Sequence, residues 1–164
     1  MGKNESTNDT VLSTADRELV ITRLLNAPRE LVWKAWTDPK HLINWFGPKG
    51  FTNTFHEIDI KPGGIWKFTM HGPDGTDYPN LVVFDKIVKP DYITYTHGSF
   101  EKPEVFKVKV SFEEVGGKTR ITMHSLFPTV EALDAALGAA KKSGALEGGN
   151  STLDKLEEEL KKMN

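Results

Sequence analysis

The chain has 164 residues, a formal net charge of −2 and no cysteine, which is typical of one domain that folds without cross-links. The absence of cysteine excludes disulfides, thiol nucleophiles and cysteine-bound metals, and the even spread of lysine and arginine argues against a nucleic-acid partner. Because no apolar run approaches ~18 residues and no signal peptide is recognised, we expect a cytoplasmic protein with no membrane partner.

Residues 1–15 are polar and rich in Asn, Ser and Thr, which is typical of a mobile leader. We therefore expect one folded domain over residues 16–164. The pattern RELVITRLL of residues 17–25 suits a first strand of that domain.

Two short helices are expected after this strand. Pro28 signals the start of the first helix, and Asp38 ends it because the residue before a proline is pushed out of the α region. Trp36 lies on the face that meets the sheet and is expected in the core, whereas Trp33 lies to one side and is expected to be half covered. The second helix is expected over Pro39 to Trp45.

The middle of the chain alternates between apolar and polar residues, which is strand periodicity. Trp66, Phe68 and Met70 share one face of such a segment. The connections are rich in Gly and Pro and are too short for parallel crossovers, so the sheet is expected to be antiparallel. The expected strands cover residues 51–60, 64–71, 78–88, 92–97, 105–112 and 119–127.

The last part of the chain has helical periodicity. Thr129 is expected to cap a helix on which Leu133 and Leu137 recur. Ser151 and Asp154 then suggest a capping box at the start of a long C-terminal helix. The apolar stripe of that helix consists of Leu153, Leu156, Leu160 and Met163.

These elements predict an α+β fold. A curved antiparallel sheet of about six to seven strands surrounds a long C-terminal helix, and two short helices follow the first strand. The terminal helix has the only apolar stripe long enough to cover one face of the sheet. A strongly curved sheet around one helix tends to leave a cavity between them that is open at one end.

Three ordered stretches carry a family resemblance: APRELVWKAWTDPKHLINWFGP, EIDIKPGGIWKFTMHGPDG and SGALEGGNSTLDKL. They resemble the single-domain bacterial relatives of the activator of heat-shock-protein-90 ATPase, in the START-like (SRPBCC) superfamily. The resemblance extends over about residues 17–163. It implies the helix-grip fold, with a hydrophobic cavity between sheet and helix. It implies no single activity, because the superfamily includes plant pathogenesis-related proteins, polyketide cyclases and lipid-transfer domains.

Candidate site residues follow from the inner face of the expected sheet, since apolar walls with a few polar groups are typical of small-molecule sites. Tyr95 and His97 would orient the polar end of a ligand if they share the inward face of their strand. The alternative is a histidine at a strand end that faces solvent or bonds to backbone. Trp45 and Phe46 are expected to seal or gate the open end. The expected ligand-binding set is Trp45, Phe46, Trp66, Phe68, Met70, Tyr95, His97, Met123 and Leu137.

We expect a binding protein for a hydrophobic or amphipathic small molecule, without a metal or other cofactor, because no catalytic set is assembled in the sequence. Two alternatives stay open. One is a cyclase-like or hydrolase-like enzyme that uses His97, Tyr95 or an acid such as Glu57. The other is a module that interacts with a chaperone ATPase, which rests on the resemblance alone. The chain is expected to be a monomer or a homodimer.

Overall fold

One antiparallel sheet of eight strands forms the body of the protein, in the order β1-β2-β8-β7-β6-β5-β4-β3. The computed structural model describes residues 10–102, 105–135 and 148–163. The strands are β1 (Thr10–Ala15), β2 (Glu18–Leu25), β3 (Thr52–Ile58), β4 (Ile65–His71), β5 (Asp77–Val88), β6 (Tyr92–Gly98), β7 (Phe106–Val115) and β8 (Lys118–Leu126). The helices are α1 (Arg29–Thr37), α2 (Pro39–Trp45) and α4 (Gly148–Met163), and residues 130–135 are also helical.

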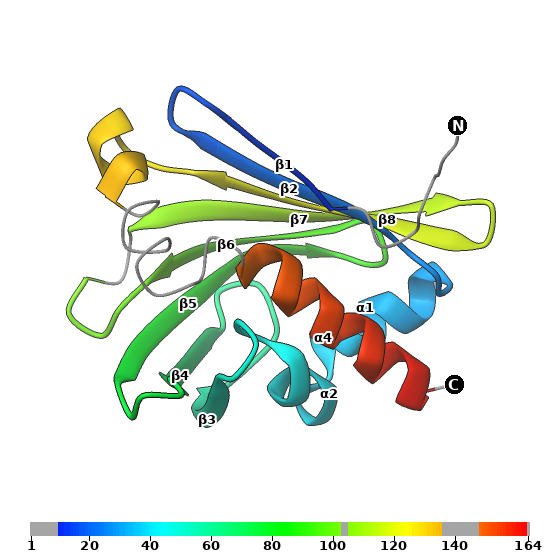
Figure 1. Ribbon diagram of the computed structural model, residues 1–164, viewed down its shortest axis with the longest axis horizontal. Helices are drawn as coiled ribbons and strands as arrows, with labels where there is room; N and C mark the ends of the chain where they lie inside the picture. Colours follow the sequence, from blue (N-terminus) through cyan, green and yellow to red (C-terminus); the bar gives the residue numbers. More distant parts are fainter. Residues whose placement is uncertain (1–9, 103–104, 136–147, 164) are drawn as a thin grey trace.

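The sheet curves around α4, with α1 and α2 beside that helix (Figure 1). We call the face toward these helices the inner face and the opposite one the outer face. This arrangement confirms the predicted helix-grip α+β fold. No helix within the described ranges is both long and apolar enough to cross a membrane.

The eighth strand comes from the segment that was expected to belong to a mobile leader. Thr10–Ala15 form β1, which pairs antiparallel with the whole of β2. Asp16 turns the chain between the two strands with a φ of 58°, a conformation that Asp tolerates better than most residues. The expectation of a leader over residues 1–15 is therefore wrong for its last six residues, which form the edge of the sheet.

Strand alternation places the expected apolar side chains on the inner face. Trp66 and Phe68 are 1% and 0% exposed, and Val110 and Phe112 are buried on β7. The stripe of α4 is also confirmed, because Leu153, Leu156 and Leu160 are buried and Met163 is half-buried.

The helix starts agree with the expectations in three cases of four, since α1 begins directly after Pro28 and α2 begins at Pro39. The hydroxyl Oγ1 of Thr129 accepts a hydrogen bond from the backbone N–H of Ala132 at 3.0 Å, so Thr129 is a helix cap as expected. Asp38 accepts from the backbone N–H of Lys40 at 3.1 Å and caps α2. The capping box expected at Ser151 is wrong, because α4 already begins at Gly148.

A buried guanidinium joins the sheet to α4. The side chain of Arg23, on the inner face of β2, is 0% exposed; its Nη2 lies 2.9 Å from Oδ1 of Asp154, and its Nη1 lies 3.5 Å from Oε2 of Glu157. Burial raises the pKa of Glu157, and the charge of Arg23 opposes that rise. The ion pairs therefore stabilise a charge that the apolar surroundings would otherwise disfavour.

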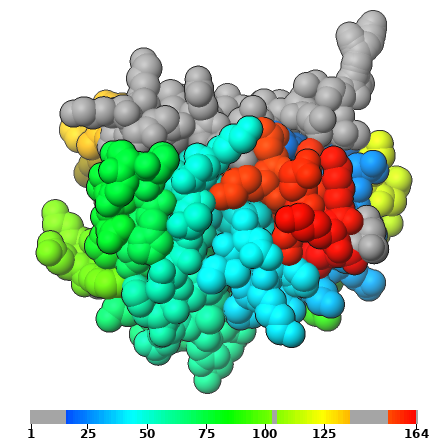
Figure 2. All heavy atoms as spheres, turned by 60° about the horizontal axis from the view of Figure 1, so that its bottom comes forward, coloured from blue at the N-terminus to red at the C-terminus, as the bar shows by residue number. Residues whose placement is uncertain are grey.

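Two further polar contacts hold α4 against α2 and the segment after it, which lie side by side in the space-filling view (Figure 2). Glu159 is 4% exposed and contacts Nδ1 of His41 at 2.8 Å and Nδ2 of Asn44 at 3.2 Å. The ammonium of Lys155 donates to the backbone oxygens of Gly47, Pro48 and Phe51 at 3.2–3.3 Å. These contacts fix both the position and the rotation of the helix.

The tryptophans of the first two helices form one aromatic core. Trp36 and Trp45 are 4% and 0% exposed, and their rings meet edge to face at 5.0 Å. Trp45 also donates its indole N–H to the backbone oxygen of Ala35 at 3.0 Å. The expected gate at Trp45 is therefore wrong, because its side chain is enclosed in the core. Trp33 was expected to be half covered, but it is 5% exposed against Phe112.

Trp45→Ala is expected to lower the free energy of unfolding by about 3–5 kcal/mol, because it leaves a large cavity and removes a buried hydrogen bond. Chemical denaturation measures this change, and Trp36→Ala should cost a similar amount. A loss below about 1 kcal/mol at Trp45 would contradict its place in the core.

Arg23→Ala is expected to cost about 3 kcal/mol of stability, because Glu157 then stays in its half-buried place without the guanidinium. Arg29→Ala is the matched control, since Arg29 pairs with Asp91 at 3.2 Å near the surface and should cost at most about 1 kcal/mol. Equal losses of unfolding free energy in both variants would show that the buried Arg23 ion pairs contribute no more to stability than a surface ion pair.

Candidate functional site

A row of inner-face side chains stays partly exposed beyond the aromatic core. It crosses the sheet diagonally from β2 to β4, and neighbouring members are paired or adjacent in the strand register, as His97 and Phe106 are. We call this set the inner-face band. Its members are Ile21, Met123, Ser125, Phe106, His97, Asn80 and Met70.

The polar centre of the band is the pair His97 and Asn80. The amide nitrogen of Asn80 donates to the backbone oxygen of Tyr78 at 2.8 Å, so its Oδ1 faces Nε2 of His97 at 2.8 Å. Because Oδ1 can only accept, Nε2 carries the proton, and no donor among the described residues bonds to the lone pair of Nδ1. Burial among aromatic rings lowers the pKa of His97 to about 4, so the imidazole is neutral at pH 7.

Tyr95 borders the band at the next inner position of β6. It is 3% exposed, and burial raises the pKa of its hydroxyl, which stays protonated at neutral pH. Within the described ranges this hydroxyl has no hydrogen-bond partner. Its ring lies 6.2 Å from that of His97. The structure thus places Tyr95 and His97 on one face of β6, and within the described residues the hydroxyl donor of Tyr95 and the Nδ1 acceptor of His97 are both unused. Their role toward a ligand stays a prediction.

The other expected wall residues are divided between core and band. The ring of Phe46 lies 4.9 Å from Trp66 and 5.7 Å from Phe68, so these three close the α2 end of the inner face rather than line an open space. Met70 and Met123 lie in the band. Leu137 lies outside the described residues.

The inner-face band also contains residues that the expected set did not include. Asn80 continues the alternation of Val82 and Phe84 along β5, and the ring of Phe106 lies 5.1 Å from that of His97, tilted by 31°. The alternation of β5 would have placed Asn80 on the inner face, but it could not show that this amide selects the tautomer of His97.

The inner-face band offers few side chains that could act as a catalytic acid, base or nucleophile. The band contains no carboxylate, and Glu57 is exposed on β3. A hydroxyl–imidazole–carboxylate chain does occur elsewhere, where His71 bridges Thr54 at 2.7 Å and Asp77 at 2.8 Å. The side chains of His71 and Asp77 are 37% and 63% exposed. Neither residue lines the outer-face hollow or the small hollow beside Pro28 and Pro90. Among those residues no group of three or more His, Asp or Glu could hold a metal ion.

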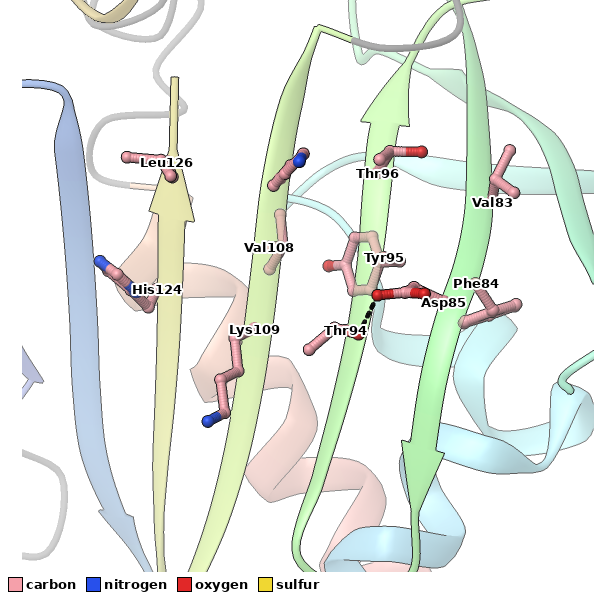
Figure 3. Close-up of a pocket in the computed structure, with 11 residues that line it drawn as sticks. Val83, Phe84, Asp85, Thr94, Tyr95, Thr96, Val108, Lys109, His124 and Leu126 are labelled. Carbon is pink, nitrogen blue, oxygen red and sulfur yellow. Dashed lines mark hydrogen bonds between the residues drawn. The ribbon is translucent and has the colours of Figure 1, made fainter. Parts of the chain in front are cut away.

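A hollow of about 560 Å³ lies on the outer face, where sequence analysis predicted no site. Figure 3 shows it from that side, with α4 behind the strands. Its polar side chains come from β5, β6, β7 and β8, so it is separated from the inner-face band by the thickness of the sheet. The polar lining consists of Asp85, Thr94, Thr96, Lys107, Lys109 and His124.

Comparison with known proteins agrees with this architecture. The profile of the family described as "Activator of Hsp90 ATPase homolog 1-like protein" matches residues 26–161. The chain belongs to this family. The resemblance noted from the sequence motifs is therefore confirmed over most of the chain.

Several solved structures share the fold over almost their whole length. Protein Ms6760 from Mycobacterium smegmatis is 25% identical, with a TM-score of 0.81 over 95% of this chain and 98% of that one. Protein NE0264 from Nitrosomonas europaea is 25% identical, with a TM-score of 0.79 over 92% and 98% of the two chains. A protein from Staphylococcus epidermidis is 26% identical, with a TM-score of 0.77 over 93% and 94%. A search of curated proteins found no significant match.

The lowered pKa of His97 predicts a pH dependence of stability. Between the ordinary value of 6.5 and about 4, the unfolded chain binds a proton that the folded state disfavours. The free energy of unfolding should therefore fall as the pH falls through this window and level off below it. Chemical denaturation at a series of pH values measures this fall.

His97→Gln should remove this part of the pH dependence, because a neutral amide replaces the imidazole. The matched control is His71→Gln on the exposed end of β4, which should keep the fall between pH 6.5 and about 4. If the profiles of the wild type and His97→Gln coincide, the imidazole is not desolvated as described.

Proposed function

We propose that the protein binds an apolar or amphipathic small molecule across the inner-face band. The observation that supports this most is the partial exposure of the band in a face that is otherwise closed by the aromatic core and α4. Covering contiguous apolar surface yields about 25 cal/mol per Å², so a ligand of suitable shape would be stabilised there. Membership of a family with the helix-grip fold is consistent with this function.

The polar groups in and beside the inner-face band define the polar end of that ligand. Tyr95 offers a hydroxyl donor, and His97 offers Nδ1 as an acceptor. No charged side chain belongs to the band, so an uncharged group with both a donor and an acceptor, such as a hydroxyl, fits better than a carboxylate. A role with a chaperone ATPase stays a prediction from the family resemblance, because no feature of the described surface favours it.

Titration with the neutral fluorophore N-phenyl-1-naphthylamine tests this proposal. Saturable binding with a blue shift of emission is expected for the wild type. Met70→Gln should weaken binding about tenfold, because it places a polar amide in the apolar wall while the length of the side chain stays nearly the same. Lys67→Gln, on the same strand but on the outer face, should bind like the wild type.

Native mass spectrometry of protein purified from its own cells would identify a retained ligand. Failure of the fluorophore to bind, or equal affinities of Met70→Gln and Lys67→Gln, would contradict the proposed site. A retained molecule with a charged head group would contradict the uncharged polar end.

A further inference from the structure

The outer-face hollow has the size of a small-molecule site. Its volume of about 560 Å³ exceeds the 220 Å³ of the other described hollow, beside Pro28 and Pro90, and it falls in the range of roughly 300–1,000 Å³ that such sites occupy. Neither α1, α2 nor α4 covers this face (Figures 1 and 3). A binding site here would therefore be spatially separate from the inner-face band.

The strand register arranges the lining in two parallel rows. In the first row Thr94 of β6, Lys109 of β7 and His124 of β8 are direct partners. The second row adds Thr96 and Lys107, which lie two residues away on the same strands. Strands lie ~4.8 Å apart and alternate residues about 7 Å apart, so the two ammonium groups can reach one small anion placed between them.

A β-bulge closes the hollow on the β5 side. The register shifts between Phe84 and Lys86, so Asp85 is an extra residue opposite Thr94. The hydroxyl of Thr94 donates to Oδ2 of Asp85 at 3.2 Å and accepts from the backbone N–H of Lys86 at 3.0 Å. Asp85 is thereby held at the rim, two strands or about 10 Å from Lys109, and the hollow has a negative and a positive end (Figure 3).

The positive end has unused donors. In the described part of the chain, neither Lys107 nor Lys109 lies within ion-pair distance of a carboxylate. The ammonium of Lys109 lies 4.5 Å from the centre of the Tyr92 ring, a contact that orients it without using its N–H groups. Thr96 has no hydrogen-bond partner there either.

The described acids near this end have other partners. Glu18, on β2, is bound to His124 and so does not pair with the lysines. Asp85 is bound by Thr94 at the opposite rim. Lys107, Lys109 and Thr96 therefore occupy neighbouring outer-face positions with no carboxylate between them in the register. The ammonium of Lys109 leans toward Tyr92, away from Thr96, so this flexible side chain has to turn back over the hollow to share an anion with Lys107.

We propose that this hollow binds a small phosphomonoester. The phosphate accepts hydrogen bonds from Lys107, Lys109 and Thr96, which together match its three terminal oxygens. The organic part lies over Val83, the outer-face partner of Thr96. Asp85 accepts from a donor at the far end of the molecule and repels a second anionic group. A carboxylate offers only two oxygens to the same donors and binds less tightly.

Phenyl phosphate is the probe for this site, and amide chemical shifts of the isotope-labelled full chain are the readout. Saturable shifts are expected at Thr96, Lys107, Lys109 and His124, with a Kd of about 1 mM or below. Benzoate should bind at least about threefold more weakly, and benzyl alcohol should leave these amides unchanged. The binding of phenyl phosphate should weaken as salt is added, because the contacts are charged.

Two variants distinguish binding in the hollow from a general attraction of the anion to positive charge on the protein surface. Lys107→Gln/Lys109→Gln should weaken binding of phenyl phosphate at least about tenfold, and Thr96→Val should weaken it about threefold with the charge unchanged. Lys67→Gln removes a lysine from the same outer face but outside the hollow, and should bind like the wild type. Unchanged amide dispersion confirms that each variant is folded.

Three results would overturn the proposal. The first is an absence of saturable shifts in the hollow. The second is equal weakening by Lys67→Gln and the double variant, which would show binding to overall positive charge. The third is a set of shifts confined to the inner-face band, which would assign the probe to the site of the proposed function.

Discussion

The position of α4 depends on charged side chains that are buried where the helix meets the rest of the fold. Its apolar stripe would pack in several rotations or shifted positions, but Arg23 must face Asp154 and Glu157, and Glu159 must face His41. Polar contacts of this kind select one arrangement among apolar alternatives more effectively than they add stability. Because α4 decides how much of the inner face is covered, these ion pairs also decide where the inner-face band lies.

Most of the fold could be predicted because it follows from local periodicity. The strands from β3 to β8, both short helices and the stripe of α4 all show period two or period 3.6 in the residues themselves. Thr10–Ala15 gave no such signal, since an edge strand needs only one partner and little apolar surface. Arg23 carried a signal that was missed: it stands between Ile21 and Leu25 in the alternation of β2, and so had to face inward.

The candidate sites were harder to predict from the sequence than the fold, because they depend on pairing between distant segments of the chain. Tyr95 and His97 could be placed on one face, but the neutral state of His97 follows from Asn80 on another strand. Trp45 was expected at a rim because glycine and proline follow it, whereas packing against Trp36 encloses it. The outer-face hollow depends on a bulge in the β5–β6 pairing and on cross-strand neighbours, neither of which has a local signature.

Strand β6 serves both faces of the sheet with consecutive residues. Tyr95 and His97 point inward, while Thr94 and Thr96 point outward, so the two surfaces share one short length of backbone. If both proposed ligands bind, a molecule that displaces or stiffens this strand from one side would change the free energy of binding on the other, and thermodynamic linkage would make that influence equal in both directions. An apolar ligand on the inner face and an anionic ligand on the outer face would therefore be coupled through β6 without touching each other.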